Sequence, residues 1–254
     1  MTPPGRHRDR LDGPAGLAIE QSAVIVGATG GIGRALVEAL LADGQTGRVW
    51  ALSRSGAAPE GATGLAIDLE DEASLARAAA RIVEGPAPTR IVIATGVLHD
   101  GYRPERTYRA LSAEHMMRDF RINAVGPALA IQALAPLLPR DRRAVLAALS
   151  ARVGSISDNR LGGWHAYRAS KAALNMILKT VAVEMARTHP QAVVAGLHPG
   201  TVDTALSAPF QGGVQPERLF DPAFAAGRLI AVMDQLAPAD SGSVFAWDGQ
   251  RIAP

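Results

Sequence analysis

The chain of 254 residues contains no cysteine, and this absence excludes disulfide bonds, thiolate nucleophiles and zinc sites built on thiolates. Its six histidines show no paired ligand spacing, so we expect no bound metal. No apolar run reaches membrane-spanning length, and the N-terminus lacks the hydrophobic segment of a secretory signal peptide. The sequence therefore predicts a cytoplasmic protein with no membrane partner.

Aromatic residues are also scarce, at 4% of the chain, and the net charge is only +2. Nucleic-acid-binding surfaces combine a basic stripe with interleaved aromatic residues, and no such stripe appears, so we expect no nucleic-acid partner. With 48% hydrophobic and 20% charged residues, the chain can bury a sizeable core. Its length suits one large α/β domain.

Lysine is the scarcest cation, since only Lys171 and Lys179 occur among 26 lysines and arginines, and there are only three tyrosines. In the segment YRASK, Tyr167 and Lys171 are four residues apart and share one face of a predicted helix. An ammonium beside a phenol lowers the tyrosine pKa from near 10, which makes the side chain an acid or base near neutral pH. Arginine is bulkier and could not present a compact ammonium to a ribose. A chance pair on an amphipathic helix is the alternative interpretation.

Short apolar runs alternate with segments of helical periodicity along the chain. This alternation predicts an α/β fold, a doubly wound Rossmann-type domain with a mostly parallel seven-stranded sheet and helices on both faces. Residues 1–20 are rich in Pro, Gly and charge and are expected to form a flexible tail, so the domain is assigned to 21–254. The expected strands are 22–28, 48–53, 64–68, 90–96, 143–150, 192–200 and 243–249; the expected helices are 31–44, 70–84, 112–138, 164–188 and 222–236.

The segment VGATGGIGR joins the first expected strand to the first expected helix. Glycines at 27, 31 and 33 let the backbone turn tightly and approach a pyrophosphate, which the N–H groups of the helix N-terminus then bind. A glycine-rich turn that binds nothing is the alternative. We therefore predict a nucleotide-binding turn made by Gly27, Thr29, Gly30, Gly31, Ile32 and Gly33.

The second expected strand ends in ALSRSG, which places Ser53 and Arg54 where a dinucleotide site contacts the adenosine ribose. An acidic residue there would accept a hydrogen bond from the 2′-hydroxyl of NAD, whereas an arginine would hold the 2′-phosphate of NADP. The segment has no carboxylate, so it favours NADP(H) over NAD(H). A solvated loop arginine is the alternative interpretation.

Taken together, the ordered motifs resemble the short-chain dehydrogenase/reductase family over nearly the whole chain after residue 20. Within that family, the sequence is most similar to the C-factor-like and sniffer-like carbonyl reductase group. The residues that carry the resemblance are Gly27-x3-Gly31-x-Gly33, Asp68 after the third strand, RINAVGP with Asn123, YRASK, and HPGTVDT at 198–204.

The resemblance implies an oxidoreductase that transfers hydride between a nicotinamide and a small carbonyl or alcohol substrate. It assigns Tyr167 as the general acid/base, Lys171 as the group that holds the ribose hydroxyls, and Asn123 as the residue that interrupts a long helix and anchors a relay water. It also implies a homodimer or homotetramer. The remaining implied cofactor contacts are Asp68, Leu69, Ala94, Thr95, Gly96, Pro199, Gly200, Val202 and Thr204.

The chain departs from the family pattern at three places. Val26 replaces the usual threonine before the first glycine, and IATG at 93–96 replaces NNAG. In SARVG at 150–154, Ala151 stands where the catalytic serine is usual. Ser150 is adjacent but points to the opposite face on a strand, and Ser155 could reach back from a loop, so both stay candidates for the missing hydroxyl.

The substitution at Ala151 keeps a second class of function open, a cofactor-binding regulatory or signalling protein with little turnover. The intact Tyr167 and Lys171 pair favours the enzyme. Three loops, near 97–108, 152–164 and 205–220, are expected to form the substrate pocket. Within the last of them, residues 207–220 are either a substrate lid or a plain surface loop.

Overall fold

The computed structural model describes residues 21–254, and the predicted N-terminal tail lies outside this range. Eight strands form the main sheet in the order β10-β9-β6-β5-β4-β1-β2-β3, and every pair is parallel except β9 with β10. Two short strands, β7 (Thr201–Val202) and β8 (Leu219–Phe220), pair separately. The main strands are β1 (Gln21–Val26), β2 (Thr46–Ser53), β3 (Thr63–Ala66), β4 (Pro88–Ile93), β5 (Ala144–Leu149), β6 (Ala192–His198), β9 (Ser243–Ala246) and β10 (Arg251–Ile252).

The predicted fold class is confirmed, and all seven expected strands are present in the main sheet. The strand count was one short because β10, the eighth strand, was not expected. This strand has only two residues and returns antiparallel to β9 after a turn that contains Gly249 (φ +84°). Two residues are too few to show the alternation that identifies a strand in a sequence.

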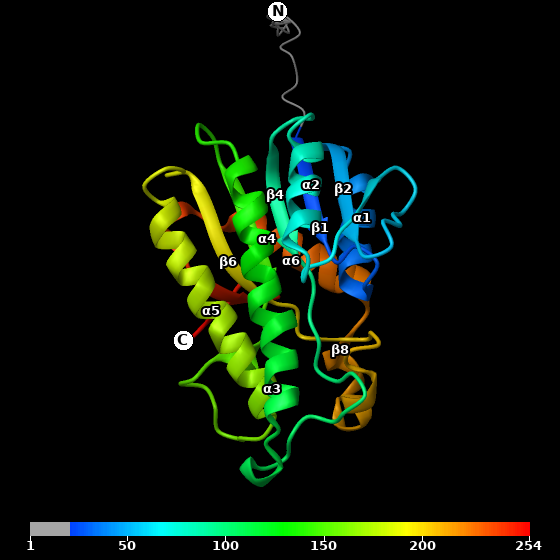
Figure 1. Cartoon of the computed structure of the whole chain (residues 1–254), viewed down its shortest axis with the longest axis vertical. Coiled ribbons are helices and arrows are strands. Elements are labelled where there is room, and N and C mark those ends of the chain that lie inside the picture. Colours follow the sequence, from blue (N-terminus) through cyan, green and yellow to red (C-terminus); the bar gives the residue numbers. More distant parts are fainter. Residues whose placement is uncertain (1–20) are drawn as a thin grey trace, which may run out of the picture.

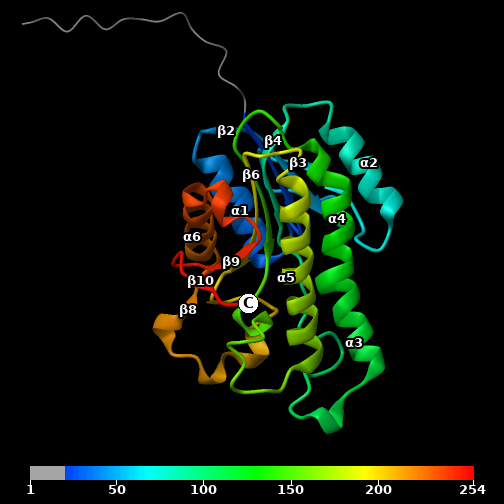
Figure 2. The same cartoon turned by 90° about the vertical axis from the view of Figure 1, so that its left-hand side faces the viewer.

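Helices cover both faces of the sheet, as Figures 1 and 2 show. Helices α1 and α6 pack on one face, and α2, α4 and α5 pack on the other. Alternation along β1 explains this, since Val24 and Val26 face one layer while Ala23 and Ile25 face the other. The helices are α1 (Gly31–Ala42), α2 (Glu72–Ile82), α3 (Ala113–Phe120), α4 (Gly126–Leu134), α5 (His165–Met185) and α6 (Pro222–Gln235), with 3-10 turns at Tyr108–Ala110, Ala135–Leu137, Arg152–Gly154, Ala208–Gly213, Pro216–Arg218 and Pro238–Asp240.

The strand order reverses between β1 and β4, because the chain runs outward from β1 through β2 and β3 and then returns to β4 on the other side. Open α/β sheets bind their ligands at such a reversal, outside the carboxyl ends of the strands. The turn after β1 and the loop after β4 meet there, since the Ala94 N–H donates to the Val26 carbonyl at 2.8 Å. The topology thus predicts where the site lies before any side chain is considered.

The long helix expected at 112–138 is interrupted in the middle. A π-helical turn (Arg121–Val125) separates α3 from α4, and the Gly126 N–H donates to the Arg121 carbonyl, five residues earlier. Pro127 has no N–H to give the carbonyl of Asn123, which lies four residues before it. Interruptions of this kind often occur at functional sites, and this one contains Asn123.

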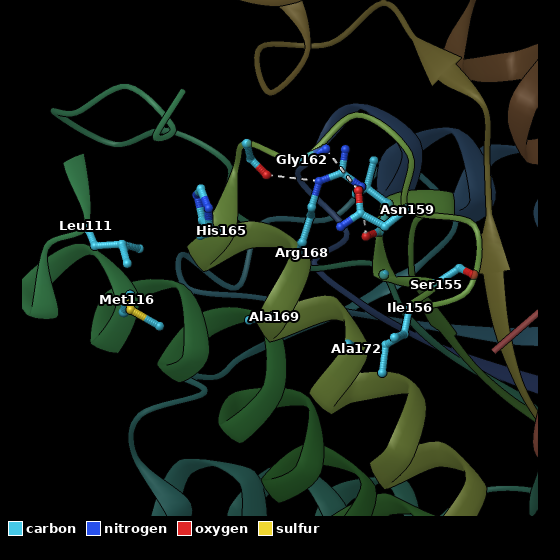
Figure 3. A pocket seen from close by; sticks show the side chains of 13 residues that line it. Leu111, Met116, Ser155, Ile156, Asn159, Gly162, His165, Arg168, Ala169 and Ala172 are labelled. Atoms are coloured by element: carbon cyan, nitrogen blue, oxygen red, sulfur yellow. Dashed lines mark hydrogen bonds between the residues drawn. The ribbon is translucent and has the colours of Figure 1, made fainter. Parts of the chain in front are cut away.

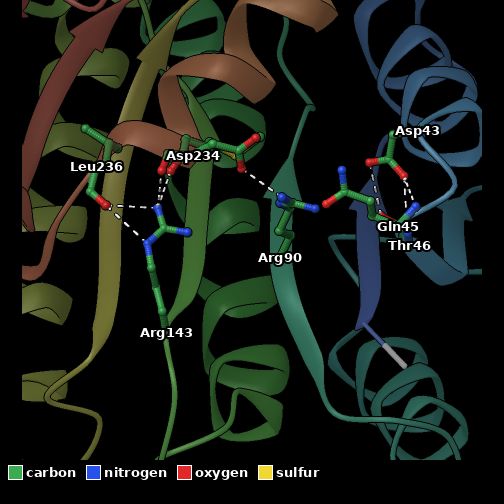
Figure 4. Close-up of polar contacts among 8 residues, drawn as sticks. Asp43, Gln45, Thr46, Arg90, Arg143, Asp234 and Leu236 are labelled. Carbon is green, nitrogen blue, oxygen red and sulfur yellow. Dashed lines mark hydrogen bonds and ion pairs between the residues drawn. The ribbon is translucent and has the colours of Figure 1, made fainter. Parts of the chain in front are cut away.

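Arg143 joins the start of β5 to the end of α6, as Figure 4 shows. Its guanidinium donates to the carbonyls of Met233 (2.5 Å), Asp234 (3.2 Å) and Leu236 (2.8 Å). These carbonyls belong to the last turn of α6, where no further helical N–H groups are available. Arg143 is therefore a side-chain cap whose positive charge also suits the negative end of the helix dipole.

We expect Arg143→Met to lower the free energy of unfolding by about 2 kcal/mol, the loss typical of hydrogen bonds to a charged group. Urea unfolding followed by circular dichroism measures this difference. The control is Arg81→Met, because Arg81 makes only an exposed pair with Glu84. Such pairs contribute about 0–1 kcal/mol. Equal losses in the two variants would contradict the capping role.

Candidate active site

The glycine turn after β1 is packed so closely that side chains would not fit. A Cβ at Gly33 would collide with the carbonyl of Gly27, and a Cβ at Gly31 would lie 2.6 Å from Thr204 Cγ2. Gly27 has a φ of +85°, which glycine adopts readily. Helix α1 then starts at Gly31, and its N-cap residue, Gly30, provides no side-chain cap. The N–H groups at the start of α1 are therefore presented to the crevice, as a pyrophosphate site requires.

The adenosine end of the crevice lies where β2 and β3 end. Arg54 is exposed directly after β2, and its guanidinium forms no ion pair within residues 21–254. Ser53 is buried and donates to the Ala57 carbonyl at 3.2 Å, which shapes the loop that carries Arg54. Asp68 accepts from the Glu70 N–H at 2.9 Å, so its carboxylate closes a local turn after β3.

Asn123 clamps the segment that follows β4. Its Oδ1 accepts from the Val97 N–H at 2.8 Å, and its Nδ2 donates to the Val97 carbonyl at 2.8 Å and to Ser170 Oγ at 3.1 Å. A Cβ at Gly96 would lie 3.4 Å from both Asn123 Oδ1 and Lys171 Nζ. The buried amide thus holds the backbone at Gly96 against the lysine. Sequence reasoning assigned Asn123 to a water relay and missed this clamp.

Tyr167 and Lys171 lie on the first two turns of α5, both buried. The ammonium of Lys171 donates to the Leu149 carbonyl at 2.8 Å, and Nζ lies 5.8 Å from the centroid of the tyrosine ring. Burial lowers the pKa of Lys171 to about 8, an effect that Asp119 partly opposes. The helix therefore carries both groups on one buried face, at the carboxyl edge of the sheet.

The sequence predicted that Lys171 lowers the pKa of Tyr167, but the structure indicates the opposite shift. Burial raises the pKa of the Tyr167 phenol above its ordinary value of 10, and the negative charge of Asp119 adds to this. Desolvation of the phenolate thus outweighs its stabilisation by Lys171, whose ammonium donates to the Leu149 carbonyl. Tyr167 therefore stays protonated at neutral pH.

Asp119 is a buried acid at this site that sequence reasoning did not identify. It is 1% exposed and accepts a hydrogen bond from the hydroxyl of Tyr102. Burial raises the pKa of the Asp119 carboxyl, and the bond from Tyr102 opposes the rise. Its position four residues before Asn123 on a predicted helix is the signal that could have indicated it.

The structure gives neither candidate serine a contact with Tyr167. Ser150 Oγ donates to Asn175 Oδ1 at 2.6 Å, and Ser155 Oγ accepts from the Asp158 N–H at 3.1 Å. Ala151 instead packs beside Tyr167 in a small apolar cluster. Ser150 and Ala151 follow β5 directly, and the backbone at Ala151 is still extended (φ −150°, ψ 149°), so the adjacent side chain of Ser150 points to the opposite side.

This apolar cluster joins the three loops expected to form the substrate pocket. Its buried members are Leu98, Ala151 and Tyr167, and its partly buried members are Val153, Trp164, Leu206 and Phe210. Leu98 comes from the loop after β4. Val153 and Trp164 come from the loop between β5 and α5, and Leu206 and Phe210 come from the segment after β6. The ring of Tyr167 therefore lies against apolar side chains from all three loops.

The segment after β6 lies against the glycine turn. Gly200 has a φ of +81°, and a Cβ there would lie 2.6 Å from the ring of Phe220. Val202 is buried, and Thr204 contacts the position of Gly31. The segment after the Pro199–Gly200 turn thus brings Thr204, one of the expected cofactor contacts, against the glycine turn.

A pocket of about 400 Å³ lies beside the N-terminal half of α5, as Figure 3 shows. It is bordered by His165, Arg168 and Ala172, together with Leu111 and Met116 from the α3 end. At 3.6 residues per turn, these α5 residues lie roughly 80–140° around the helix from the face of Tyr167 and Lys171. Val153 borders the pocket and also belongs to the apolar cluster, so the pocket adjoins that cluster.

Between residues 21 and 254, the acidic and histidine side chains form no group of three that could hold a metal ion. None of the helices in the same range has both the length and the apolarity needed to span a bilayer.

The crevice at the strand-order reversal, the packed glycine turn and the buried Tyr167 and Lys171 pair define a Rossmann-type, dinucleotide-dependent oxidoreductase. The comparison with known families agrees. Residues 21–213 match the model of the short chain dehydrogenase family, so the chain belongs to that family of NAD(P)-dependent oxidoreductases.

Two characterised relatives share about a third of the aligned residues. The C-signal protein of Myxococcus xanthus is 33% identical over 138 residues, which are 54% of this chain and 77% of that protein. The 1-hydroxy-2-glutathionyl-2-methyl-3-butene dehydrogenase of Rhodococcus sp. strain AD45 is 35% identical over 140 residues, 55% of this chain and 59% of that one.

Solved structures show the same fold at lower identity. The NADPH-bound carbonyl reductase from chicken fatty liver superposes with a TM-score of 0.80 at 23% identity, covering 92% of this chain and 94% of that one. The carbonyl reductase Sniffer of D. melanogaster superposes with a TM-score of 0.79 at 24% identity, covering 92% and 100%.

Proposed function

We propose that this protein is an NADP(H)-dependent oxidoreductase that interconverts a carbonyl compound and its alcohol. The observation that carries the proposal is the meeting of Asn123 and Lys171 at Gly96, at the carboxyl edge of the sheet, with the Tyr167 ring beside Lys171. An NADPH-bound carbonyl reductase shares the fold, which supports both the cofactor and the reaction.

The crevice fits a dinucleotide. The glycine turn leaves no space for side chains where a pyrophosphate would approach the backbone, and Thr95 Oγ1 is a buried hydroxyl without a partner among residues 21–254. Gly27, Gly31 and the start of α1 would hold the pyrophosphate, Arg54 the 2′-phosphate, and Val202 with Thr204 the carboxamide. When bound, the reduced nicotinamide supplies the hydride.

Tyr167 supplies the proton in the direction of carbonyl reduction. Its hydroxyl has no hydrogen-bond partner among residues 21–254, and burial keeps it protonated. As negative charge develops on the carbonyl oxygen, the phenol donates its proton to that oxygen. In the reverse direction, the phenolate takes the proton from the alcohol.

Lys171 stabilises the phenolate left after this transfer, because its ammonium lies on the same helix face one turn away. In the proposed proton path, Asn123 acts through its backbone carbonyl, while its side-chain amide binds Val97. Because Pro127 cannot donate to the carbonyl of Asn123, that carbonyl is available to hold a water molecule between Lys171 and solvent. The tyrosine would regain its proton along this path.

A panel of aldehydes and ketones with NADPH, followed by loss of absorbance of the reduced cofactor, tests the proposal. Turnover of at least one compound is expected. Absence of turnover throughout the panel would favour the second candidate function, a cofactor-binding regulatory protein. Ala151 at the serine position and the similarity to the protein named C-signal are the observations that favour this alternative.

The cofactor preference gives a separate prediction. Arg54→Ala should weaken NADPH binding about 10- to 100-fold, the loss expected when charged hydrogen bonds to a phosphate are removed. NADH affinity should change little, since NADH carries no 2′-phosphate. Calorimetry with each cofactor measures both values.

Arg77→Ala is the matched control, because Arg77 is an exposed arginine on α2 that pairs with Asp71. It should leave both affinities unchanged. If wild-type protein binds NADH as tightly as NADPH, the assigned preference is wrong.

A further inference from the structure

Three consecutive residues before α5 adopt a left-handed backbone. Gly162 and Gly163 have φ values of +64° and +68°, and Trp164 has a φ of +51° with a ψ of +44°. Trp164 is the only residue other than glycine with a positive φ between 21 and 254. A bulky side chain is strained in this conformation, whereas glycine is not.

Four hydrogen bonds impose this conformation. Asn159 Oδ1 accepts from the Gly162 N–H at 3.0 Å, and Arg168 Nε donates to the Gly163 carbonyl at 2.9 Å, as Figure 3 shows. The backbone carbonyl of Glu105 accepts from the Trp164 N–H at 2.5 Å, and its Oε2 accepts from the Ala166 N–H at 3.3 Å. Strained residues persist where surrounding contacts over-determine them, and they are concentrated at functional sites.

The conformation directs the indole toward the catalytic tyrosine. The ring of Trp164 meets that of Tyr167 edge to face, at 6.3 Å between centroids and 73° between planes. It also meets Phe210 edge to face, at 5.0 Å and 61°. Phe210 comes from the segment after β6, so the indole joins two loops that are far apart in the sequence.

The other members of the cluster that adjoins Tyr167 are apolar. Leu98, Val153 and Leu206 belong to the same cluster, and Ala151 brings a methyl group to the position beside Tyr167. A hydroxylated or charged substituent here would lose its water without gaining a partner from these side chains. A flat apolar substituent would instead pack on the two aromatic rings.

We propose that Trp164 determines the specificity of this site, and that the substrate is a carbonyl compound with an aryl group beside the reacting carbon. The indole and Phe210 form the aromatic wall against which that group packs. The proposal rests on the proposed carbonyl–alcohol activity and adds the substrate class.

Three ketones of graded chemistry test it with NADPH: acetophenone, cyclohexyl methyl ketone and dihydroxyacetone. We expect kcat/KM to be highest for acetophenone and at least about tenfold lower for dihydroxyacetone, a ratio set by packing in an apolar pocket. Trp164→Gly relieves the backbone strain and removes the ring. It should lower kcat/KM for acetophenone about 10- to 100-fold and change that for dihydroxyacetone by less than about threefold.

Phe210 forms the other half of the wall and belongs to a different segment of the chain. If Trp164→Gly no longer binds NADPH, Phe210→Ala replaces it in the test, with the same selective loss of kcat/KM for acetophenone expected. Trp164→Phe keeps an aromatic ring and should retain the order of the three ketones. Tyr108→Ala, an exposed aromatic outside the cluster, should behave as wild type.

The outcomes separate the two proposals. Turnover that is equal for acetophenone and dihydroxyacetone, or unaffected by both wall variants, overturns the specificity proposal and leaves the oxidoreductase proposal standing. If none of the ketones is reduced, calorimetric binding of acetophenone to the protein with NADP⁺ decides. If the wild-type protein binds acetophenone and Trp164→Gly does not, the aromatic wall is supported. If both bind it equally, or if neither binds it, the specificity proposal is overturned.

Discussion

Tyr167→Phe is expected to lower kcat/KM for an accepted carbonyl substrate by a factor on the order of 10²–10⁴, the contribution typical of general acid catalysis. The substitution removes only the hydroxyl and keeps the ring that packs with Ala151 and Trp164. Affinity for NADPH should therefore be retained. Steady-state kinetics and calorimetry on the same preparation measure the two effects.

Three variants serve as controls for this result. Tyr108→Phe removes an exposed tyrosine hydroxyl and should have no effect. Ser150→Ala and Ser155→Ala should each retain most of the activity, because their hydroxyls bind Asn175 and Asp158 N–H rather than Tyr167. A large loss in either serine variant would show that a hydroxyl reaches the carbonyl after all, and wild-type turnover by Tyr167→Phe would contradict the mechanism.

Those parts of the site that depend on residues close together in the sequence could be predicted from the sequence. The glycine turn follows from Gly27, Gly31 and Gly33 between a strand and a helix, and the shared face of Tyr167 and Lys171 follows from their spacing. The interruption at Asn123 was expected from the family resemblance, and the structure shows its physical basis in Pro127. In each case the signal lies within a few residues.

What could not be predicted depends on distant segments. The pKa of Tyr167 is governed by burial beneath loops that the spacing of Tyr and Lys does not reveal. Asp119 could not be predicted because its hydrogen-bond partner, Tyr102, belongs to a distant loop without periodicity. Trp164 in a left-handed conformation runs against its intrinsic preference and is held by Glu105 from another loop.

Lys171→Met should lower both turnover and NADPH affinity, because the ammonium is proposed to serve the phenolate and the ribose together. We expect a loss in kcat/KM on the order of 10²–10³, comparable to that of other acid–base residues. Lys179→Met, the same change at the other lysine of the chain, is the control and should leave both values near wild type.

The same substitution should also change how stability depends on pH. Burial lowers the pKa of Lys171 from 10.5 to about 8, so above pH 8 the folded state releases a proton that the unfolded state retains up to about 10.5. The unfolded state then binds more protons, and the free energy of unfolding of the wild-type protein must rise with pH in this window. Below pH 8, both states hold the proton and the buried ammonium destabilises the fold by a constant amount. Lys171→Met has no such group, so its stability should lack the rise between pH 7 and pH 9.5. Urea unfolding at these two values measures the difference, and parallel changes in wild type and variant would show that Lys171 keeps an ordinary pKa.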